Sequence, residues 1–242
     1  MGRLEGKVAI ITGAAGGQGE AEARLFISEG AKVILTDIND RGAAIAEELG
    51  ENALFALHDV SREAAWERVV AQAIERFAKI DVLVNNAAVY RPRSFMETDR
   101  DLMDYHYSTN QLGVFLGMKA VLGPMSDAGG GSIVNISSIA GLRATPESFA
   151  YACSKWAVRG MTKCAALDLA TRGIRVNSIH PGVIDTPMLD EHPPEYRKIL
   201  IDMTPCKRIG APSEVAQAVL FLASDAASYV SGAELAVSYG IT

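Results

Sequence analysis

A short apolar strand followed at once by a cluster of glycines is the feature that most limits how this chain can fold. The run Lys7–Thr12 (KVAIIT) is apolar and β-branched, and it ends at residues 13–19 (GAAGGQG). A helical pattern with Ala21, Leu25 and Phe26 on one side follows directly. The order strand, glycine turn, helix is typical of the start of a parallel α/β sheet.

The rest of the chain repeats this alternation, which predicts an α/β fold with a Rossmann-type, doubly wound parallel sheet of about seven strands in the order 3-2-1-4-5-6-7. The later strands are expected at Ala31–Thr36, Ala53–Leu57, Ile80–Val84, Ser132–Ser137, Ile174–Ile179 and Ala233–Val237. Helices are expected at about Asp40–Leu49, Arg62–Ala78, Thr98–Leu122 and, capped by Ser213, Pro212–Leu222. Residues 1–242 are expected to form a single dinucleotide-binding catalytic domain. A substrate flap is expected at about 186–207, within which Pro187–Met203 is rich in Pro, Met and charge.

Composition limits the class of partner. The formal net charge is −6, which argues against nucleic-acid and anionic-membrane binding and favours a small molecule. Three cysteines without paired spacing suggest reduced thiols, and no apolar run approaches the roughly 18 residues of a membrane span, so we expect a cytoplasmic protein. None of the four histidines (His58, His106, His180 and His192) shares ligand spacing with another, so we expect no catalytic metal.

The glycine turn and the end of the second strand together indicate a nucleotide site. Glycines let the backbone approach a pyrophosphate, which the free N–H groups and the dipole of the following helix would bind. Taken alone, the turn is also compatible with a plain tight turn. However, Asp37 ends the second strand, where a carboxylate accepts hydrogen bonds from both ribose hydroxyls and repels a 2′-phosphate. The pattern favours NAD over NADP, although Asp37 alone is also compatible with an ordinary strand end.

Polar and small residues also follow two other strands. Asp59 is placed to bind an adenine amino group, and Asn86 and Ala87 follow the fourth strand, where open parallel sheets bind ligands. Asn110 lies in an increasingly apolar helical stretch and needs partners, which are either functional or simply local backbone groups.

Tyr151 and Lys155 stand four residues apart near the start of a helix, so both side chains project from one face. An ammonium beside a phenol favours the phenolate, which predicts a lowered pKa for Tyr151 and proton exchange near neutral pH. The pair alone is weak evidence, because the same spacing arises by chance.

Taken together, these residues resemble the short-chain dehydrogenase/reductase family over essentially the whole chain. The matching motifs are Thr12-Gly13-x-x-x-Gly17-x-Gly19, Asn85-Asn86-Ala87, Asn110, Ser138, Tyr151-x-x-x-Lys155 and Pro181-Gly182-x-x-x-Thr186. The segments GGGSIVNISS, SKWAVRG and SYVSGAELAV most resemble bacterial NAD-dependent hydroxysteroid and cyclic-alcohol dehydrogenases. A ketoacyl-type reductase is less favoured, because those usually bind NADPH through basic residues where Asp37 stands here.

The resemblance implies a catalytic set and a cofactor site. Tyr151 would be the general acid/base, Lys155 would hold the nicotinamide ribose and lower the tyrosine pKa, Ser138 would hydrogen-bond the substrate oxygen, and Asn110 would anchor a proton-relay water. The implied cofactor contacts, besides Tyr151 and Lys155, are Gly13, Gly17, Gln18, Gly19, Asp37, Ile38, Asp59, Val60, Asn86, Ala87, Pro181, Gly182, Ile184 and Thr186. A homotetramer is also implied, with Ser238-Tyr239-Gly240 replacing the usual Asp-Gly-Gly near a subunit contact.

The expected substrate contacts are mostly apolar: Tyr90, Ile139, Ala140, Thr145, Phe149, Val183 and Met188. They favour a hydrophobic secondary alcohol or ketone, such as a cyclic alcohol, a hydroxysteroid or an aryl ketone. Each of these residues is equally compatible with a core position. The competing class is an NAD-binding sensor or scaffold of the same fold without catalysis. The intact set of Asn110, Ser138, Tyr151 and Lys155 argues against that class.

Overall fold

A seven-stranded parallel sheet in the order β3-β2-β1-β4-β5-β6-β7 forms the centre of the computed structural model, which describes residues 2–191 and 195–241. The order is the one predicted. The strands are β1 (Val8–Thr12), β2 (Lys32–Asp37), β3 (Ala53–Leu57), β4 (Val82–Asn85), β5 (Gly131–Ile136), β6 (Ile174–Pro181) and β7 (Glu234–Val237). The switch between β1 and β4 opens a crevice at their carboxyl ends, where such sheets bind nucleotides.

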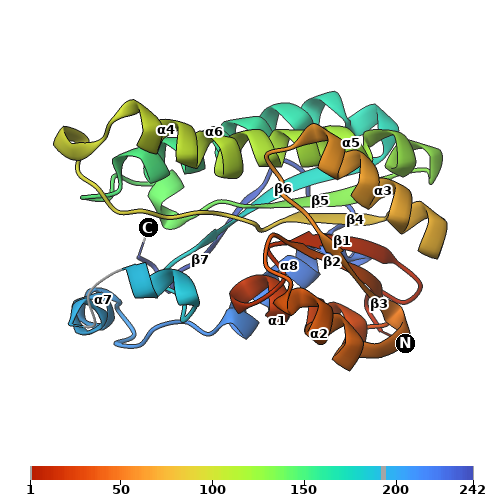
Figure 1. Ribbon diagram of the computed structural model, residues 1–242, viewed down its shortest axis with the longest axis horizontal. Helices are drawn as coiled ribbons and strands as arrows, with labels where there is room; N and C mark the ends of the chain where they lie inside the picture. The colour runs from red at the N-terminus through yellow and green to blue at the C-terminus, as the bar shows by residue number, and fades with distance from the viewer. Residues whose placement is uncertain (1, 192–194, 242) are drawn as a thin grey trace.

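Helices cover both faces of the sheet (Figure 1). One face carries α1 (Gly17–Ser28), α2 (Arg41–Leu49) and α8 (Pro212–Ala223), and the other carries α3 (Glu63–Phe77), α4 (Arg100–His106), α5 (Gly113–Asp127) and α6 (Phe149–Asp168). Two buried apolar clusters fill the layers, one around Phe26 and Leu35 and the other around Trp66 and Ile133. Burial of these clusters is the main favourable term in folding.

The prediction of one continuous helix from Thr98 to Leu122 is wrong in that the helix is interrupted. The chain instead forms α4, a π-helical stretch η3 (Tyr107–Leu112) and then α5, which runs on to Asp127. The wider π turn lets the Asn110 side chain satisfy both backbone groups of Val89, at 2.8 Å from its N–H and 2.9 Å from its carbonyl oxygen. Such turns are frequent at functional sites.

Two other sequence expectations change. The helix α8 begins at Pro212 with Ala211 as the cap residue, so Ser213 lies inside the first turn and is not the cap. The Glu214 carboxylate accepts a hydrogen bond from the Ala211 N–H at 2.8 Å. This side chain, and not that of Ser213, therefore provides the hydrogen bond at the N-terminus of α8.

The expected flap contains ordered helix. It comprises η6 (Pro187–Glu191) and α7 (Tyr196–Met203), while residues 192–194 of the flap lie outside the described residues. Figure 1 shows α7 at the end of the molecule where the chain terminates, away from the two helix layers. Among the described residues, no helix combines the length and apolar character needed to cross a bilayer.

Candidate active site

A cavity of about 800 Å³ lies at the carboxyl edge of the sheet. Its walls come from the glycine turn, the ends of β2, β3 and β4, the start of η4 (Ile139–Gly141), the first turn of α6, and the loop that follows β6. Segments far apart in sequence therefore meet at one place, as expected for a parallel sheet.

The glycine turn has the backbone form that only glycine adopts readily. Gly13 has φ +67°, and a Cβ there would lie 2.8 Å from the Ala87 Cα; Gly17 has φ +57°. Gly16 precedes α1 without any side-chain cap, so the first N–H groups of that helix remain available to a ligand. Gly19 does not line the cavity. A Cβ there would lie 2.3 Å from the Gly13 carbonyl oxygen, so Gly19 allows the helix to pack against the turn.

Thr12 and Asn86 lock this turn to the neighbouring strand. The Thr12 hydroxyl accepts hydrogen bonds from the backbone N–H groups of Asn86 and Ala87 at 3.0 and 2.9 Å. The Asn86 amide in return donates to the carbonyl oxygens of Thr12 and Gly13 at 2.9 and 3.1 Å. These four bonds fix the position of the turn relative to β4.

Asp37 lies at the edge of the cavity with a fixed carboxylate. One oxygen accepts from the Ala15 N–H at 3.0 Å and the other from the Asn39 N–H at 2.9 Å. Asp59 lines the same region and accepts from the backbone and hydroxyl of Ser61. Lys155 is the single lysine or arginine among the described residues that line the cavity.

Ser138, Tyr151 and Lys155 meet at the end of β5. The backbone of Ser138 is extended, and its Oγ accepts a hydrogen bond from the Ala140 N–H at 3.1 Å. The Ser138 and Tyr151 hydroxyls are hydrogen bonded to each other. Lys155 is buried, donates from Nζ to the Ile136 carbonyl oxygen at 2.9 Å, and lies with Nζ 5.6 Å from the centre of the Tyr151 ring.

The expected effect of Lys155 on Tyr151 is not found in the protein without nucleotide. Burial raises the pKa of Tyr151 to about 12, although the Ser138 hydrogen bond acts in the opposite direction. Burial also lowers the pKa of Lys155 to about 7, because the ammonium loses its hydration and has no carboxylate partner among the residues that the structure describes. The spacing of the pair was predicted to stabilise the phenolate, but burial is the largest cause of both pKa shifts, and Lys155 is not among the causes acting on Tyr151. Tyr151 is therefore protonated at neutral pH.

Neighbouring serines point in different directions. Ser137 is buried, and its hydroxyl donates to the Lys155 backbone carbonyl at 2.9 Å, which ties β5 to α6. Ser138 instead faces Tyr151. The alternation of side chains along a strand explains why one of the two contributes to the site and the other to the scaffold.

Asn110 is fully buried and is not part of the cavity wall. Besides its bonds to Val89, its amide donates to the Ser154 hydroxyl at 3.1 Å, and Ser154 in turn donates to the Tyr151 backbone carbonyl at 2.7 Å. These contacts hold the first turn of α6 against η3. The proton-relay role expected for Asn110 stays a prediction.

Most of the expected substrate residues line the cavity, namely Tyr90, Ile139, Ala140, Thr145, Val183 and Met188. Phe149 does not: its ring packs edge-to-face on Phe95 at 5.0 Å between centres, outside the cavity wall. As the first residue of α6, Phe149 projects away from the face that carries Tyr151. The Tyr90 ring contacts the Tyr151 ring edge-to-face at 4.8 Å.

Among the cavity-lining residues that sequence reasoning missed are His58, Tyr105 and Thr109. His58 immediately precedes Asp59 at the end of a strand, so its position in the sequence could have predicted a place at the cavity. Tyr105 and Thr109 are brought to the cavity by α4 and the π turn, which periodicity does not predict. Among the described residues no cluster of His, Cys, Asp and Glu is suited to hold a metal ion; His192 lies outside them.

Comparison with known proteins gives consistent matches over nearly the full chain. The family model described as enoyl-(acyl carrier protein) reductase matches residues 13–242. The chain is 44% identical to a 3-alpha-(or 20-beta)-hydroxysteroid dehydrogenase of Mycobacterium tuberculosis, over 99% of this chain and 90% of that protein. It is 43% identical to a cyclopentanol dehydrogenase of Comamonas testosteroni, over 100% and 99% of the two chains. A crystal structure of 3-ketoacyl-(acyl-carrier-protein) reductase from Brucella melitensis complexed with NADH superposes with a TM-score of 0.93 at 33% identity, covering 98% of this chain and 99% of that one.

Proposed function

Because this chain belongs to the short-chain dehydrogenase/reductase family, we propose that it is an NAD(H)-dependent enzyme that interconverts a hydrophobic cyclic secondary alcohol and its ketone. The observation that carries the proposal is the meeting of Ser138, Tyr151 and Lys155 in one cavity with the glycine turn and Asp37. A sensor or scaffold of the same fold would bind a nucleotide without needing a hydrogen-bonded Ser–Tyr pair inside the cavity.

The residues present fit a nicotinamide dinucleotide. The turn glycines leave space for a pyrophosphate beside the open N-terminus of α1. The Asp37 carboxylate, held by two backbone N–H groups, is proposed to accept hydrogen bonds from ribose hydroxyls. Asp59 and Val60 are proposed to hold the adenine, and Pro181, Gly182, Ile184 and Thr186 to line the nicotinamide side. Ile38, Gln18 and Ala87 complete the proposed contacts, whereas Gly19 acts through packing.

A preference for NAD over NADP is supported by charge. A 2′-phosphate near Asp37 would meet a carboxylate, and the cavity wall offers no arginine and no lysine other than Lys155 among the described residues. The 2′-phosphate would therefore be repelled by the Asp37 carboxylate and would find no cationic side chain other than Lys155 in the described cavity wall to compensate its charge.

The proposed mechanism assigns one task to each side chain. Nicotinamide, when bound, supplies or accepts the hydride. Ser138 donates a hydrogen bond to the substrate oxygen and stabilises the charge that develops there. Tyr151, whose raised pKa keeps it protonated at neutral pH, donates its proton to that oxygen during reduction and recovers it during oxidation. Lys155 is proposed to bind the nicotinamide ribose through Nζ.

The cavity wall near Tyr151 selects an apolar substrate. Ile139, Ala140, Val183 and Met188 present aliphatic surface beside the reacting groups, and Tyr90 adds an aromatic wall. This surface supports a ring ketone over a phosphorylated sugar, because charged groups would remain unpaired there. A ketoacyl substrate is the second candidate, supported by the likeness to the Brucella reductase.

The test is loss of NADH absorbance with a panel of cyclic, steroid and aryl ketones and a ketoacyl thioester. We expect turnover of at least one ring ketone, with Tyr151→Phe retaining NADH binding and losing kcat by more than ~10²-fold, the lower end of what general acid–base catalysis contributes. Close to native kcat in Tyr151→Phe would refute the assignment, and NADH binding without turnover across the panel would favour the sensor.

Cofactor preference is tested separately with kcat/KM for NADH and NADPH. NADH is expected to be favoured, and Asp37→Ala should narrow the gap between the two. The neighbouring Asn39→Ala is the matched control. It removes the side-chain oxygen that accepts a hydrogen bond from the Arg41 N–H, but it keeps the backbone N–H that donates to the Asp37 carboxylate. An NADPH advantage in the wild-type protein would refute the argument from Asp37.

We further propose that the protein acts as a cytoplasmic homotetramer. Large apolar side chains are exposed on the helices of one face, including Phe115, Trp156 and Leu167, with Leu167 81% exposed. Burial between subunits would explain this exposure. Light scattering after size exclusion measures the mass directly, and a monomer at micromolar concentration would refute the assembly.

A further inference from the structure

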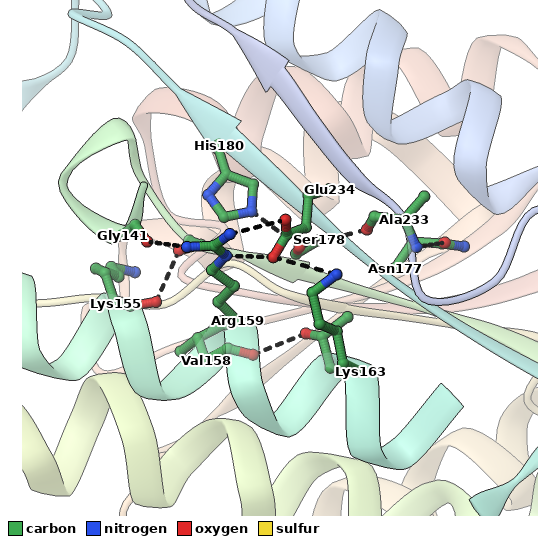
Figure 2. A network of polar contacts seen from close by, with 12 residues as sticks. Gly141, Lys155, Val158, Arg159, Lys163, Asn177, Ser178, His180, Ala233 and Glu234 are labelled. Carbon is green, nitrogen blue, oxygen red and sulfur yellow. Dashed lines mark hydrogen bonds and ion pairs between the residues drawn. The ribbon is translucent and has the colours of Figure 1, made fainter. Parts of the chain in front are cut away.

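The backbone of Ser138 is held from behind by a buried histidine. His180, on β6, is fully buried, and its Nδ1 lies 3.0 Å from the Ser138 carbonyl oxygen. Its Nε2 lies 2.9 Å from the Ser178 hydroxyl. The imidazole thus connects β6 with the first residue after β5, which is the residue proposed to bind the substrate oxygen. Figure 2 shows the ring beside Ser178 and the Glu234 side chain.

The hydrogen-bond partners fix the tautomer. A carbonyl oxygen only accepts, so Nδ1 must carry the proton that is shared with Ser138. The Ser178 hydroxyl has two acceptors within reach, Nε2 of His180 at 2.9 Å and the Ala233 carbonyl oxygen at 3.4 Å. In the neutral ring with the proton on Nδ1, Nε2 is the nearer acceptor for that hydroxyl. Burial lowers the pKa of His180, which keeps the ring neutral.

The loop that follows Ser138 is tied to the scaffold at a second point. Arg159, on α6, forms an ion pair with Glu234 on β7, and Lys163 lies 3.6 Å from the same carboxylate (Figure 2). The Arg159 guanidinium also lies 3.5 Å from the Gly141 carbonyl oxygen, at the end of η4. Both ends of the segment Ser138–Gly141 are therefore anchored to β6, α6 and β7.

We propose that His180 is a positioning residue for catalysis, which sets the orientation of Ser138 by donating from Nδ1 to its backbone carbonyl. The inference rests on the proposed function of Ser138. The Ser138 side chain is only a few bonds from the held carbonyl, and its hydroxyl must meet both Tyr151 and the substrate oxygen. A rotation of this peptide would move the hydroxyl away from both. The alternative is that His180 only fills space between β6 and β5.

Two substitutions separate these explanations. Asparagine places an amide nitrogen near the position of Nδ1, whereas glutamine places one near Nε2, so His180→Asn keeps the bond to Ser138 and His180→Gln loses it. We expect His180→Gln to lower kcat by roughly tenfold or more, since misplacement of about 1 Å costs up to ~10²-fold. His180→Asn should recover most of that loss. KM for NADH and the thermal midpoint should differ little between the two variants.

Coupling to Ser138 provides the second measurement. If His180 acts through Ser138, His180→Gln should change the residual kcat of Ser138→Ala by less than about twofold, because the hydroxyl it orients is already gone. Equal kcat values for His180→Asn and His180→Gln, or an undiminished effect of His180→Gln in the Ser138→Ala background, would overturn the proposal.

A third measurement depends neither on turnover nor on the stability of any variant. Long-range ¹H–¹⁵N correlation spectra of the wild-type protein report which imidazole nitrogen is protonated. A signal for the Nδ1–H tautomer supports the proposal, and the Nε2–H tautomer overturns it. If no ketone is reduced by the wild-type protein, the proposed function fails, while this spectrum still tests the link between His180 and Ser138.

Discussion

Replacement of Lys155 by methionine should stabilise the nucleotide-free protein at acid pH and destabilise it at alkaline pH. Lys155 is 2% exposed, and its Nζ has the Ile136 carbonyl oxygen as a hydrogen-bond partner. Burial lowers its pKa from 10.5 to about 7. Methionine has a similar length and no charge, so it removes the ionisation and largely keeps the packing.

The magnitude follows from the two pKa values. A fall from 10.5 to about 7 means that burying the charged lysine lowers the stability of the folded protein by about 5 kcal/mol below pH 7. Between pH 7 and 10.5 the unfolded chain binds more protons at this residue than the folded chain does. Wild-type stability from this group therefore rises with pH, by about 1.4 kcal/mol for each pH unit. Loss of the bond to the carbonyl oxygen costs the variant about 1–3 kcal/mol at every pH.

These terms predict that Lys155→Met is more stable than wild type by about 2–4 kcal/mol at pH 6, once the lost hydrogen bond is subtracted from the relieved burial of charge. At pH 10 the lysine is neutral in the folded protein, so the sign reverses and the variant is less stable. The variant should also lose activity, because the proposed ribose contact is gone.

The measurement is urea unfolding followed by circular dichroism at pH 6, 8 and 10, without nucleotide and at one protein concentration. The difference between the two proteins isolates Lys155, since other titrating groups are common to both. A variant that is less stable at pH 6, or a difference that does not change with pH, would refute the reasoning that burial lowers the lysine pKa.

Three further predictions concern stability and substrate binding. Neither carboxylate oxygen of Glu22 has a hydrogen-bond partner among the described residues, and burial raises its pKa from 4.5 to about 8. Below pH 4.5 the carboxyl is neutral in both the folded and the unfolded protein, and as pH rises through 8 the folded protein must carry a buried charge and loses stability. In urea titrations Glu22→Gln should therefore exceed wild-type stability by about 2–4 kcal/mol at pH 9 and show no gain at pH 4. On α5, a Cβ at Gly117 would lie 2.5 Å from a buried asparagine oxygen, whereas a Cβ at Gly123 would meet no described atom within 4 Å. In the same assay Gly117→Ala should lower the free energy of unfolding by about 1–3 kcal/mol and Gly123→Ala should raise it by about 0.5–1 kcal/mol. Equal effects would contradict the close packing of α5 at Gly117. Phe149→Ala should leave KM for the ketone within about twofold, whereas Met188→Ala should raise it by 10-fold or so, because only Met188 lines the cavity; a larger effect at Phe149 would place it in the site.

The fold was largely predictable because its signals are local. Buried parallel strands read as short β-branched runs, and the glycine turn and Asp37 mark where the first two strands end. Given these runs, the handedness and continuity of connections leave few orders for the sheet, and the one expected is the one found. Spacing alone also placed Tyr151 and Lys155 on one helix face, since four residues make about one turn.

Other features depend on which distant segments pack together. The π turn at Tyr107–Leu112 satisfies Val89, which is far from it in sequence, and no periodicity encodes that partner. Phe149 was expected among the apolar substrate contacts, but as the first residue of α6 it packs against Phe95 instead.

The electrostatics of the Tyr151–Lys155 pair were decided by burial. From sequence, Lys155 and Tyr151 are a phenol and an ammonium at helical spacing, which predicts mutual stabilisation of charge. In the fold both are removed from water, and the cost of that removal moves the two pKa values toward the neutral forms. Likewise His180 is one residue before a loop motif in the sequence, and only the pairing of β5 with β6 brings it to the Ser138 carbonyl. The sequence therefore determined the sheet, the turn and the side chains proposed to react, because these depend on residue type and local spacing. Tertiary structure decided their protonation and orientation, because both depend on desolvation and on contacts between residues distant in the chain.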